Sequence, residues 1–360
     1  MRFNPAWIRG WRLTVAGRYI LLAATWLIVI TVLHCSLNIH REDREVVRMG
    51  YMPVVTNLAA PLLDFVSRDK GPYRFQAIKF ASFAEMAESL RNGHIDAAFM
   101  IAPLAIVLRQ QKENVRIVYI GNRHESTLVA RKDLAIRTID DLAGKTLAVP
   151  MRYSGHHLGI LRAMEARGMS GAINIVEMNP PDMASALSSG ALDAYFVGEP
   201  FAAQTVLSRD ARVVNYVEDL WPRFICNLVI VKQDLIDKRP EAVKQLVQSA
   251  MRSGLWAEQH PDEAADIAAR YWNQPPDLIR YALTTPTARI DYQRSVPQSS
   301  EIQLLADLMV QFKLIDRNDI TGLVEDRFAL EANLEYISTV DSLIKSTAVS
   351  VQQKEKKDDD

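Results

Sequence analysis

Apolar runs that suit buried strands alternate with amphipathic segments along most of this chain. Met86, Ala87 and Leu90 recur at helical spacing, which predicts a short helix with one buried face. Gly93 follows, where a left-handed helix C-cap favours a residue without a Cβ atom. Residues 95–100 then have the length and composition of a strand that is buried on both faces. A helix, a buried strand and a further helix in succession indicate an α/β fold with a parallel sheet.

The same pattern occurs a second time, 97 residues further along the chain. Residues 181–200 match residues 84–103 without a gap at eight of twenty positions, whereas chance would give about one or two. A self-match of this period indicates two copies of one structural unit. The identical pairs are Met86/Met183, Ala87/Ala184, Leu90/Leu187, Gly93/Gly190, Asp96/Asp193, Ala97/Ala194, Phe99/Phe196 and Pro103/Pro200.

The two units are expected to form two lobes, because 360 residues are too many for one ordinary core. We predict the first lobe in residues 45–131 and the second in residues 132–225. The chain then returns to the first lobe over residues 226–345. Similar strand-like runs at 126–132 and 226–232 predict two crossings between the lobes, which would make a hinge. Alternatively, each of these two strands is central in its own sheet.

The remaining elements follow from the same patterns. Further strands are predicted at residues 46–50, 74–80, 115–120, 145–149 and 173–178. The C-terminal helices are predicted at residues 240–260, 262–271, 276–283, 300–312 and about 328–344, and residues 346–360 as a charged, disordered tail. Residues 1–40 are set apart as a signal or anchor segment.

That N-terminal segment has a basic flank followed by an apolar core. Residues 19–33 carry no charge, four arginines precede them, and the first acidic residue is Glu42. This arrangement is typical of a secretory signal or signal anchor, and it predicts an exported, periplasmic chain. Extended by six residues, the apolar segment is long enough to span a bilayer. Cleavage, lipidation at Cys35 and retention as an anchor remain open, because His34 occupies the small-residue position of a lipoprotein box.

Composition excludes several function classes. The chain has 42 basic and 43 acidic residues, so its overall charge does not point to a nucleic-acid partner. Cys35 and Cys226 give no disulfide framework, and Cys226 is expected to be a small core residue. The sequence shows neither a nucleophile-base set nor a paired-carboxylate set, so we predict that the chain is not an enzyme and takes no cofactor.

Four strand-to-helix corners are expected to carry a ligand site, because doubled parallel sheets bind ligands outside the carboxyl ends of their strands. The corners are residues 51–57, 101–103, 150–157 and 198–201. Backbone N–H groups at helix starts favour an anion, and hydroxyl, amide and imidazole groups add donors. A small oxyanion such as nitrate, bicarbonate or a sulfonate is the predicted ligand. The candidate ligand-binding residues are Pro53, Thr56, Asn57, Pro103, Ser154, Gly155, His156, His157 and Glu199.

Several of these candidates also have a purely structural explanation. Thr56 and Ser154 are suited to cap helices. His156 and His157 are adjacent, so on a helix they point about 100° apart and one of them is expected to face the cleft. A zinc site would need histidines four residues apart and further ligands, which the sequence does not offer, so no metal site is predicted.

Glu199 is the residue that fits an anion least well. Its carboxylate would repel an anion unless it pairs with a cation, with a ligand amine or with Arg152. Alternatively, Glu199 caps the helix that follows it and complements the helix dipole. The sequence leaves both roles open.

At these corners the chain resembles a known family. VPMRYSGHHLGILRA, then NPPDMASALSSGALDAYFVGEPF, is similar to the nitrate/sulfonate/bicarbonate (NitT/TauT-like) substrate-binding proteins of ABC importers. The nitrate- and bicarbonate-binding branch is the most similar, with its VP…S-x-H, PPDM and EPF motifs. MGYMPVVTNLAAPLL and LVIVKQDLIDKRPEAV match in the same order, so the resemblance covers about residues 45–328.

The resemblance implies a type II periplasmic-binding fold with a two-strand hinge. It also implies that Ser154 and His156 contact the ligand, and that the partners are a small anionic solute and the permease and ATPase subunits of an importer. Residues 216–221 resemble a segment that is basic in nitrate binders and acidic in bicarbonate binders, so Glu218 is added as a candidate that argues against nitrate. The aromatic residue usual early in the first lobe is missing from residues 53–56.

Two other functions stay open at this point. Some relatives of this fold make thiamine-pyrimidine precursors, so an enzyme is the second interpretation, which the absence of their cysteine-rich motif does not favour. For a binding protein, the alternative ligand is such a precursor or another organic solute. The third is a membrane-anchored solute sensor, which the short arm before the apolar segment does not favour, because that arm is too short for a signalling domain.

Overall fold

The structure is a computed structural model that describes residues 14–38 and 44–344. The chain has two compact units, residues 1–44 and 45–360. The described part of the first is one helix, α1 (Val15–Asn38), in which Val15–His34 form a twenty-residue apolar span of mean hydropathy 1.9 with none of it buried. By length and composition this helix can cross a membrane, as expected of a signal or anchor segment. The predicted tail at 346–360 lies outside the described residues.

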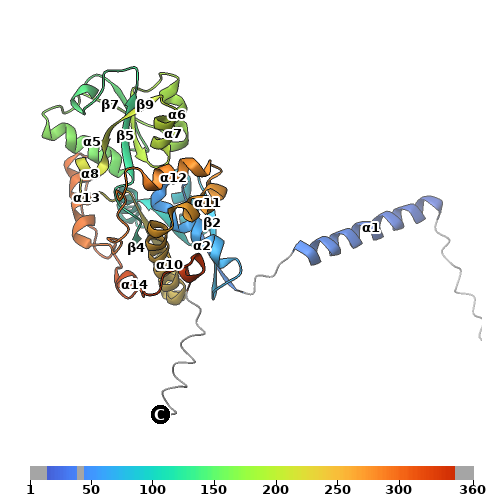
Figure 1. The fold of residues 1–360 in the computed structure, drawn as a ribbon. Coiled ribbons are helices and arrows are strands. Elements are labelled where there is room, and N and C mark those ends of the chain that lie inside the picture. The colour runs from blue at the N-terminus through green and yellow to red at the C-terminus, as the bar shows by residue number, and fades with distance from the viewer. Residues whose placement is uncertain (1–13, 39–43, 345–360) are drawn as a thin grey trace, which may run out of the picture. The chain divides into compact units, whose positions relative to one another are not determined.

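The second unit is built on two five-stranded sheets of the same design (Figure 1). The first sheet has the strand order β2-β1-β3-β10-β4 and the second β7-β6-β8-β5-β9. In each sheet three neighbouring strands are parallel, and the fourth strand runs antiparallel to both of its neighbours. The first sheet contains β1 (Glu45–Tyr51), β2 (Tyr73–Lys79), β3 (Ala97–Ile101), β4 (Val115–Ile120) and β10 (Asn227–Lys232). The second contains β5 (Ser126–Arg131), β6 (Thr146–Val149), β7 (Asn174–Glu177), β8 (Ala194–Gly198) and β9 (Ala211–Tyr216).

The strand order of the two sheets contains both the internal repeat and the two crossings between the lobes. The repeated strands β3 and β8 hold the same third position in the two sheets. The chain enters the second sheet with β5 and returns to the first with β10, and each of these strands is the antiparallel member of its sheet. The first lobe was predicted to end at residue 131, but the chain crosses to the second sheet before Ser126, so β5 belongs to the second lobe. Both strands are buried along nearly their whole length, so their sequences do not reveal which sheet they join.

The aspartate shared by the two repeat copies has the same role in each. Asp96 Oδ2 accepts a hydrogen bond from the N–H of Arg48 at 2.8 Å, and Asp193 Oδ2 accepts one from the N–H of Thr146 at 2.9 Å. Arg48 lies in β1 and Thr146 begins β6. Each carboxylate thus satisfies a backbone donor on the parallel neighbour of its own strand, which explains the repeated aspartate by sheet assembly.

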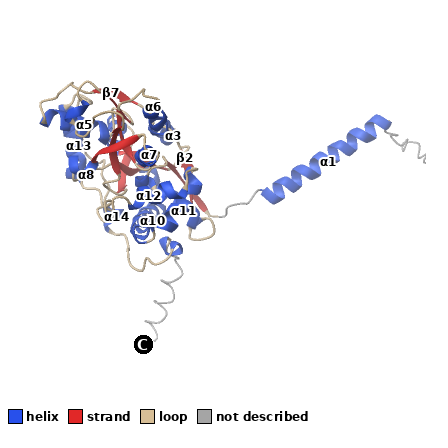
Figure 2. Cartoon of the chain, turned by 45° about the horizontal axis from the view of Figure 1, so that its top comes forward, coloured by secondary structure: helices blue, strands red, loops and turns tan. Residues whose placement is uncertain are grey.

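Helices flank both sheets (Figure 2). In chain order the first sheet is accompanied by η1 (Val55–Asn57), α2 (Ala59–Ser67), α3 (Phe83–Arg91), α4 (Ala102–Gln110) and α9 (Gln233–Lys238). The second is accompanied by η2 (Asp140–Leu142), α5 (Gly155–Ala166), α6 (Pro180–Ser188), α7 (Phe201–Leu207) and α8 (Val217–Leu220). The C-terminal helices are α10 (Pro240–Gln259), α11 (Pro261–Trp272), α12 (Pro276–Thr284), α13 (Ser299–Gln311) and α14 (Arg327–Leu330), followed by η3 (Val340–Leu343).

Most of the C-terminal helices pack on the first sheet's side of the unit. Helices α10, α11 and α14 share one hydrophobic core with β1 and α2. Helix α13 packs on α4, while α12 contacts α7 of the other half. Because α13 packs on the first half and α12 contacts the second, the segment between these two helices reaches the second sheet.

The helix predicted at about residues 328–344 is wrong: that segment contains only the short α14 and η3. The reason is the buried side chain of Arg252 in α10. Its guanidinium donates to the carbonyl oxygens of Asn333, Glu335, Tyr336 and Ser342 at 2.6–3.2 Å. A helix would use those carbonyls internally, so an irregular backbone is the conformation that satisfies the buried cation.

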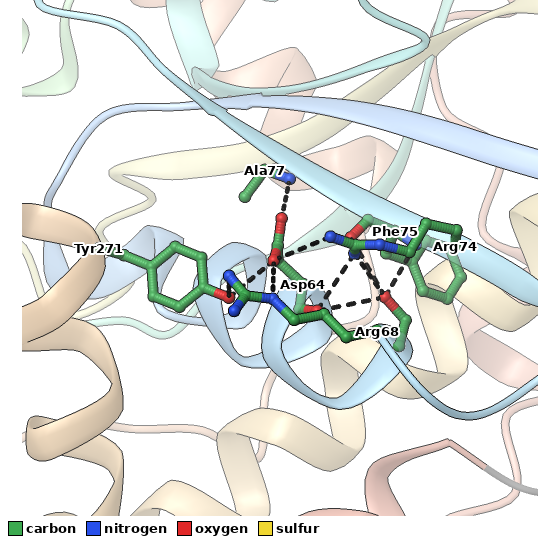
Figure 3. A network of polar contacts seen from close by, with 7 residues as sticks. Asp64, Arg68, Arg74, Phe75, Ala77 and Tyr271 are labelled. Atoms are coloured by element: carbon green, nitrogen blue, oxygen red, sulfur yellow. Dashed lines mark hydrogen bonds and ion pairs between the residues drawn. The ribbon is translucent and has the colours of Figure 1, made fainter. Parts of the chain in front are cut away.

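A second buried charge ties α2 to β2 and α11 (Figure 3). Asp64 of α2 accepts hydrogen bonds from the hydroxyl of Tyr271 and the N–H of Ala77, both at 2.7 Å. Arg68 and Arg74 approach the same carboxylate at 3.3 and 3.2 Å. Every oxygen of this buried carboxylate is satisfied by protein groups, so the network has a structural role.

Candidate functional site

The corners that follow β1 and β8 touch one another. The backbone N–H of Val55 donates to the carbonyl oxygen of Glu199 at 2.8 Å. Asn122, between β4 and β5, donates from Nδ2 to the carbonyl oxygen of Val55 at 3.0 Å. Buried polar side chains from both halves gather around these contacts. This corner cluster consists of Thr56, Asn57, Asn122, Glu125, Ser126, Thr127, His156, Glu199, Cys226, Asn227 and Arg289, none of them more than 9% exposed.

His156 lies in the first turn of α5, enclosed by aromatic rings. Its ring meets those of Phe196 and Phe224 edge-on, with centroids 4.9 and 5.4 Å apart. Nε2 lies 2.9 Å from Oγ of Ser126, whereas the buried Nδ1 has no hydrogen-bond partner among the described residues. Burial lowers the pKa of His156 to about 3, so its ring is neutral at neutral pH.

Ser154 and His157 have structural partners instead. Ser154 precedes α5, and its Oγ accepts a hydrogen bond from the N–H of His157 at 3.1 Å, which is the helix-capping role. The ring of His157 bonds through Nδ1 to the carbonyl oxygen of Arg152 at 2.8 Å. Of the two adjacent histidines, His156 is therefore the one that joins the corner cluster.

Glu125 is fully buried beside Ser126 and was missed from the sequence. Its Oε1 accepts a hydrogen bond from the Ser126 hydroxyl and its Oε2 one from the N–H of Glu199, both at 2.9 Å. Gly198 leaves the necessary room, since a Cβ there would lie 2.7 Å from Oε2. Burial raises the pKa of Glu125, against the effect of these hydrogen bonds. The sequence signal that could have identified Glu125 is its position directly before the buried strand β5.

Glu199 combines the two roles that the sequence left open. Its Oε2 accepts the N–H of Ala203 at 2.7 Å, which caps α7, and its Oε1 accepts the hydroxyl of Thr127 at 2.7 Å. The cation nearby is Arg289, with Nη1 3.9 Å from Oε1, so of the partners considered from the sequence a cation other than Arg152 lies beside Glu199. Burial raises the pKa of Glu199 to about 7.

Arg289 is the second site residue missed from the sequence. It lies between α12 and α13, and its side chain is only 3% exposed. Nε donates to Oε1 of Glu218 at 2.9 Å, Nη1 to the hydroxyl of Thr127 at 3.0 Å, and Nη2 to the carbonyl of Ser126. The guanidinium stacks over the ring of Tyr216 at 4.3 Å. Because its neighbours are distant in sequence, only the folded chain reveals this role.

On the side of the first sheet, the amide of Asn57 is paired, whereas one hydroxyl and one amide oxygen are not. Asn57 donates to the carbonyl of Met52 at 3.0 Å and accepts from Nδ2 of Asn227 at 2.8 Å. Thr56 Oγ1 and Asn122 Oδ1 are buried without a hydrogen-bond partner among the described residues. With Nδ1 of His156, the corner cluster holds three such atoms. Buried polar atoms are nearly always satisfied, so this concentration points to a ligand or to ordered water.

The remaining predicted residues shape the corners. Pro53 is buried after β1, and Pro103 is buried in the first turn of α4, where the N–H of Ala102 donates to the carbonyl of Cys226 at 3.1 Å. Gly155 is required by close packing, because a Cβ there would lie 2.8 Å from the Phe224 ring. Burial raises the pKa of the Cys226 thiol, with the charge of Glu125 as a further cause.

A pocket of about 240 Å³ lies at the third corner, between the two halves. Residues 82–84, at the start of α3, line it from the first half. Pro150, Met151 and residues 177–179 line it from the second half. This pocket brings solvent to the end of β6, next to the helix that carries His156. Among residues 14–38 and 44–344, no group of three His, Cys, Asp or Glu side chains is placed to hold a metal ion.

Comparison with known proteins places the chain among solute-binding proteins. The sequence profile of the NMT1-like family matches residues 40–271. The taurine-binding periplasmic protein of Escherichia coli is 29% identical over 179 residues, 48% of this chain and 54% of that protein. The chain thus aligns with about half the length of this relative. A protein assigned to the binding of aliphatic sulfonates in Bacillus subtilis is 23% identical over 341 residues, 89% of this chain and 98% of that protein.

The fold has a close counterpart among solved structures. The crystal structure of the periplasmic nitrate-binding protein NrtA from Synechocystis superposes with a TM-score of 0.72 at 16% identity, over 84% of this chain and 92% of that chain. At this identity the likeness concerns the fold alone. It confirms the periplasmic-binding fold with two α/β lobes that the sequence predicted.

Proposed function

This chain belongs to the NMT1-like family, within the NitT/TauT-like substrate-binding proteins, and we propose that it is the extracytoplasmic substrate-binding component of an ABC importer for a small anionic solute. The observation that carries the proposal is the corner cluster, in which three buried polar atoms from both halves have no hydrogen-bond partner within residues 14–38 and 44–344. Relatives named for binding taurine, aliphatic sulfonates and nitrate support an oxyanion of the nitrate, bicarbonate or sulfonate type. The chain acts by binding its solute, and a permease with its ATPase moves the solute across the membrane.

The ligand is bound at the four corners by groups from both halves. Thr56 contributes its hydroxyl and His156 its Nδ1, whereas the amide oxygen of Asn122 accepts a hydrogen bond from a protonated group of the solute or from water. Ser154, Gly155 and the two prolines fix the backbone at the corners. The lobes move about the two crossings before Ser126 and Asn227, and the bond from Val55 to Glu199 forms on closure. His157 faces the carbonyl of Arg152 and serves as the matched control for His156.

A thermal-unfolding screen tests this function. The full-length chain in mild detergent is heated with nitrate, bicarbonate, ethanesulfonate or taurine while tryptophan fluorescence is recorded. At a ligand concentration of about 100 Kd, binding to the native state adds about 2.7 kcal/mol, which raises Tm by several degrees. The shift should disappear in His156→Ala and persist in His157→Ala. Absence of a shift with every anion contradicts the proposal.

An organic solute with hydrogen-bond donors is the second candidate. It is favoured by one observation, the presence of Glu125, Glu199 and Glu218 around a single arginine, Arg289. A thiamine-related pyrimidine in the same screen distinguishes this candidate, since it should shift Tm where the anions do not.

We propose that the N-terminal helix directs export of the chain across the cytoplasmic membrane, as a signal or an anchor segment. An uncleaved α1 holds the binding unit at the outer face of the cytoplasmic membrane, and a cleaved one releases it into the periplasm. Cell fractionation followed by mass measurement of the mature chain separates retention, cleavage and lipidation. A full-length chain in the cytosolic fraction contradicts export.

A further inference from the structure

Three side chains of the corner cluster form a continuous chain of hydrogen bonds. Oε1 of Glu125 lies 2.9 Å from Oγ of Ser126, and the same Oγ lies 2.9 Å from Nε2 of His156. The other ring nitrogen, Nδ1, is buried without a partner among the described residues. All three side chains are buried, at 2% exposure or less.

The single hydroxyl proton of Ser126 makes the two ends interdependent. When Glu125 is ionised, its carboxylate requires that proton, so Nε2 of His156 must carry a hydrogen and donate it to Oγ. The neutral ring then has its lone pair on Nδ1. In this state Nδ1 accepts a hydrogen bond and repels an anion.

Protonation of Glu125 reverses the direction of every bond. The carboxyl O–H donates to Oγ, the Ser126 hydroxyl donates to Nε2, and the hydrogen of the ring lies on Nδ1. A proton that adds to Nδ1 reaches this state without charging the ring: the Nε2 hydrogen passes to Oγ, and the former hydroxyl hydrogen passes to Oε1 of Glu125. One proton has then been taken from solvent, and Nδ1–H donates to an anion.

The surroundings of Glu125 make its protonation accessible. Among the described residues it forms no ion pair, and burial raises its pKa. The Cys226 thiol, the Ser126 hydroxyl and the Glu199 N–H donate hydrogen bonds to it, and Arg289 acts on it through charge. The other titratable groups that face it are the Glu199 carboxylate, the Cys226 thiol and the Tyr292 hydroxyl. On its own segment, Arg123 is paired with Glu301 and His124 bonds to the carbonyl of Pro222.

We propose that Glu125, Ser126 and His156 form a proton relay, so that the site takes up one proton together with each anion that it binds. This inference rests on the proposed function and deepens it. The relay converts a site with buried carboxylates into an anion site, because the bound anion meets a neutral Glu125 and a donating Nδ1–H. Anion affinity therefore falls as the pH rises above the pKa of Glu125 in the free protein.

Calorimetric titration of the full-length chain tests the coupling, with ethanesulfonate and nitrate as probes. Titrations at one pH in buffers of different ionisation enthalpy give the number of protons taken up. Wild type should take up about one proton per anion where Glu125 is ionised in the free protein, and its Kd should rise about tenfold per pH unit there. Glu125→Gln should bind without proton uptake and independently of pH, because the amide accepts the Glu199 N–H and donates to Ser126, which fixes Nδ1–H. Glu88→Gln, on the exposed face of α3, is the control and should behave as wild type.

The tautomer of His156 gives a readout that needs no ligand. Long-range ¹H–¹⁵N spectra, assigned with His156→Asn, should show Nε2–H at high pH and Nδ1–H at low pH in wild type. Glu125→Gln should show Nδ1–H throughout. Anion binding without proton uptake, together with a tautomer that does not change with pH, overturns the relay and leaves the proposed function intact. Failure of every anion to bind overturns both, even if the tautomer switches.

Discussion

Nε of Arg289 lies 2.9 Å from Oε1 of Glu218, which joins the segment between α12 and α13 to α8 beside the second sheet. The same guanidinium is 3.9 Å from the buried Glu199 carboxylate. One arginine thus links the C-terminal part of the chain to two acidic residues of the other half.

Arg289→Ala should lower the free energy of unfolding by about 3 kcal/mol, because it leaves buried carboxylates without their cation. Denaturant titration at neutral pH measures this change. Arg280 is the matched control, since it also pairs with carboxylates, those of Asp262 and Asp277, but is 38% exposed. Arg280→Ala should change stability by no more than about 1 kcal/mol. Equal effects of the two substitutions would argue against a special role for Arg289.

Glu199→Gln should change the pH dependence of stability. The pKa of Glu199 is raised to about 7, above that of the unfolded chain, so its contribution is present at low pH and is lost as the pH rises toward 7. Glu199→Gln has no carboxyl group at this position to ionise, so its stability does not fall with pH for this reason. Its stability relative to wild type should therefore rise by on the order of 3 kcal/mol between pH 4.5 and pH 8.

Unfolding curves of both proteins across that range provide the measurement. The opposite contribution of His156, whose lowered pKa favours the folded state at higher pH, is present in both proteins and cancels in the difference. A difference that stays constant with pH would show that Glu199 titrates normally.

Gly155→Ala should destabilise the protein by about 1–3 kcal/mol, because the added Cβ would lie 2.8 Å from the Phe224 ring and 3.1 Å from the carbonyl of Ile225. Gly159 in the same helix meets only Phe196, at 3.4 Å. Gly159→Ala should be near neutral, since the gain in helix propensity offsets the tighter contact. Thermal unfolding compares the two variants, and the reverse order would contradict this packing.

Asp64→Ala should cost about 3 kcal/mol of stability without changing the affinity for a ligand. The substitution removes the acceptor for Tyr271 and Ala77 and leaves Arg74 without its carboxylate (Figure 3). Asp64 belongs to the core around α2 and not to the corner cluster. Calorimetry below the melting temperature separates the two properties, and a change in Kd would show that the network reaches the site.

The sequence determined much of this protein through local pattern and repetition. The repeat of residues 84–103 at 181–200 predicted two similar sheets, because identical spacing of helix, glycine and buried strand requires the same packing. The sequence alone was also sufficient to recognise the apolar N-terminal segment and the family motifs. Among the residues of the corner cluster, His156 and Glu199 lie at the predicted corners, where the chain leaves β6 and β8.

Tertiary structure decided what depends on contacts between distant segments. It assigned β5 to the second sheet, because a strand that is buried on both faces fits either one. It replaced the predicted last helix by an irregular segment between α14 and η3, because the buried guanidinium of Arg252 binds the carbonyl oxygens of that segment. It also brought Glu125 and Arg289 to His156 and Glu199 from 31 or more residues away. Hydrophobic periodicity records only which face of a segment is buried, whereas a buried charge is defined by the groups that the fold places around it.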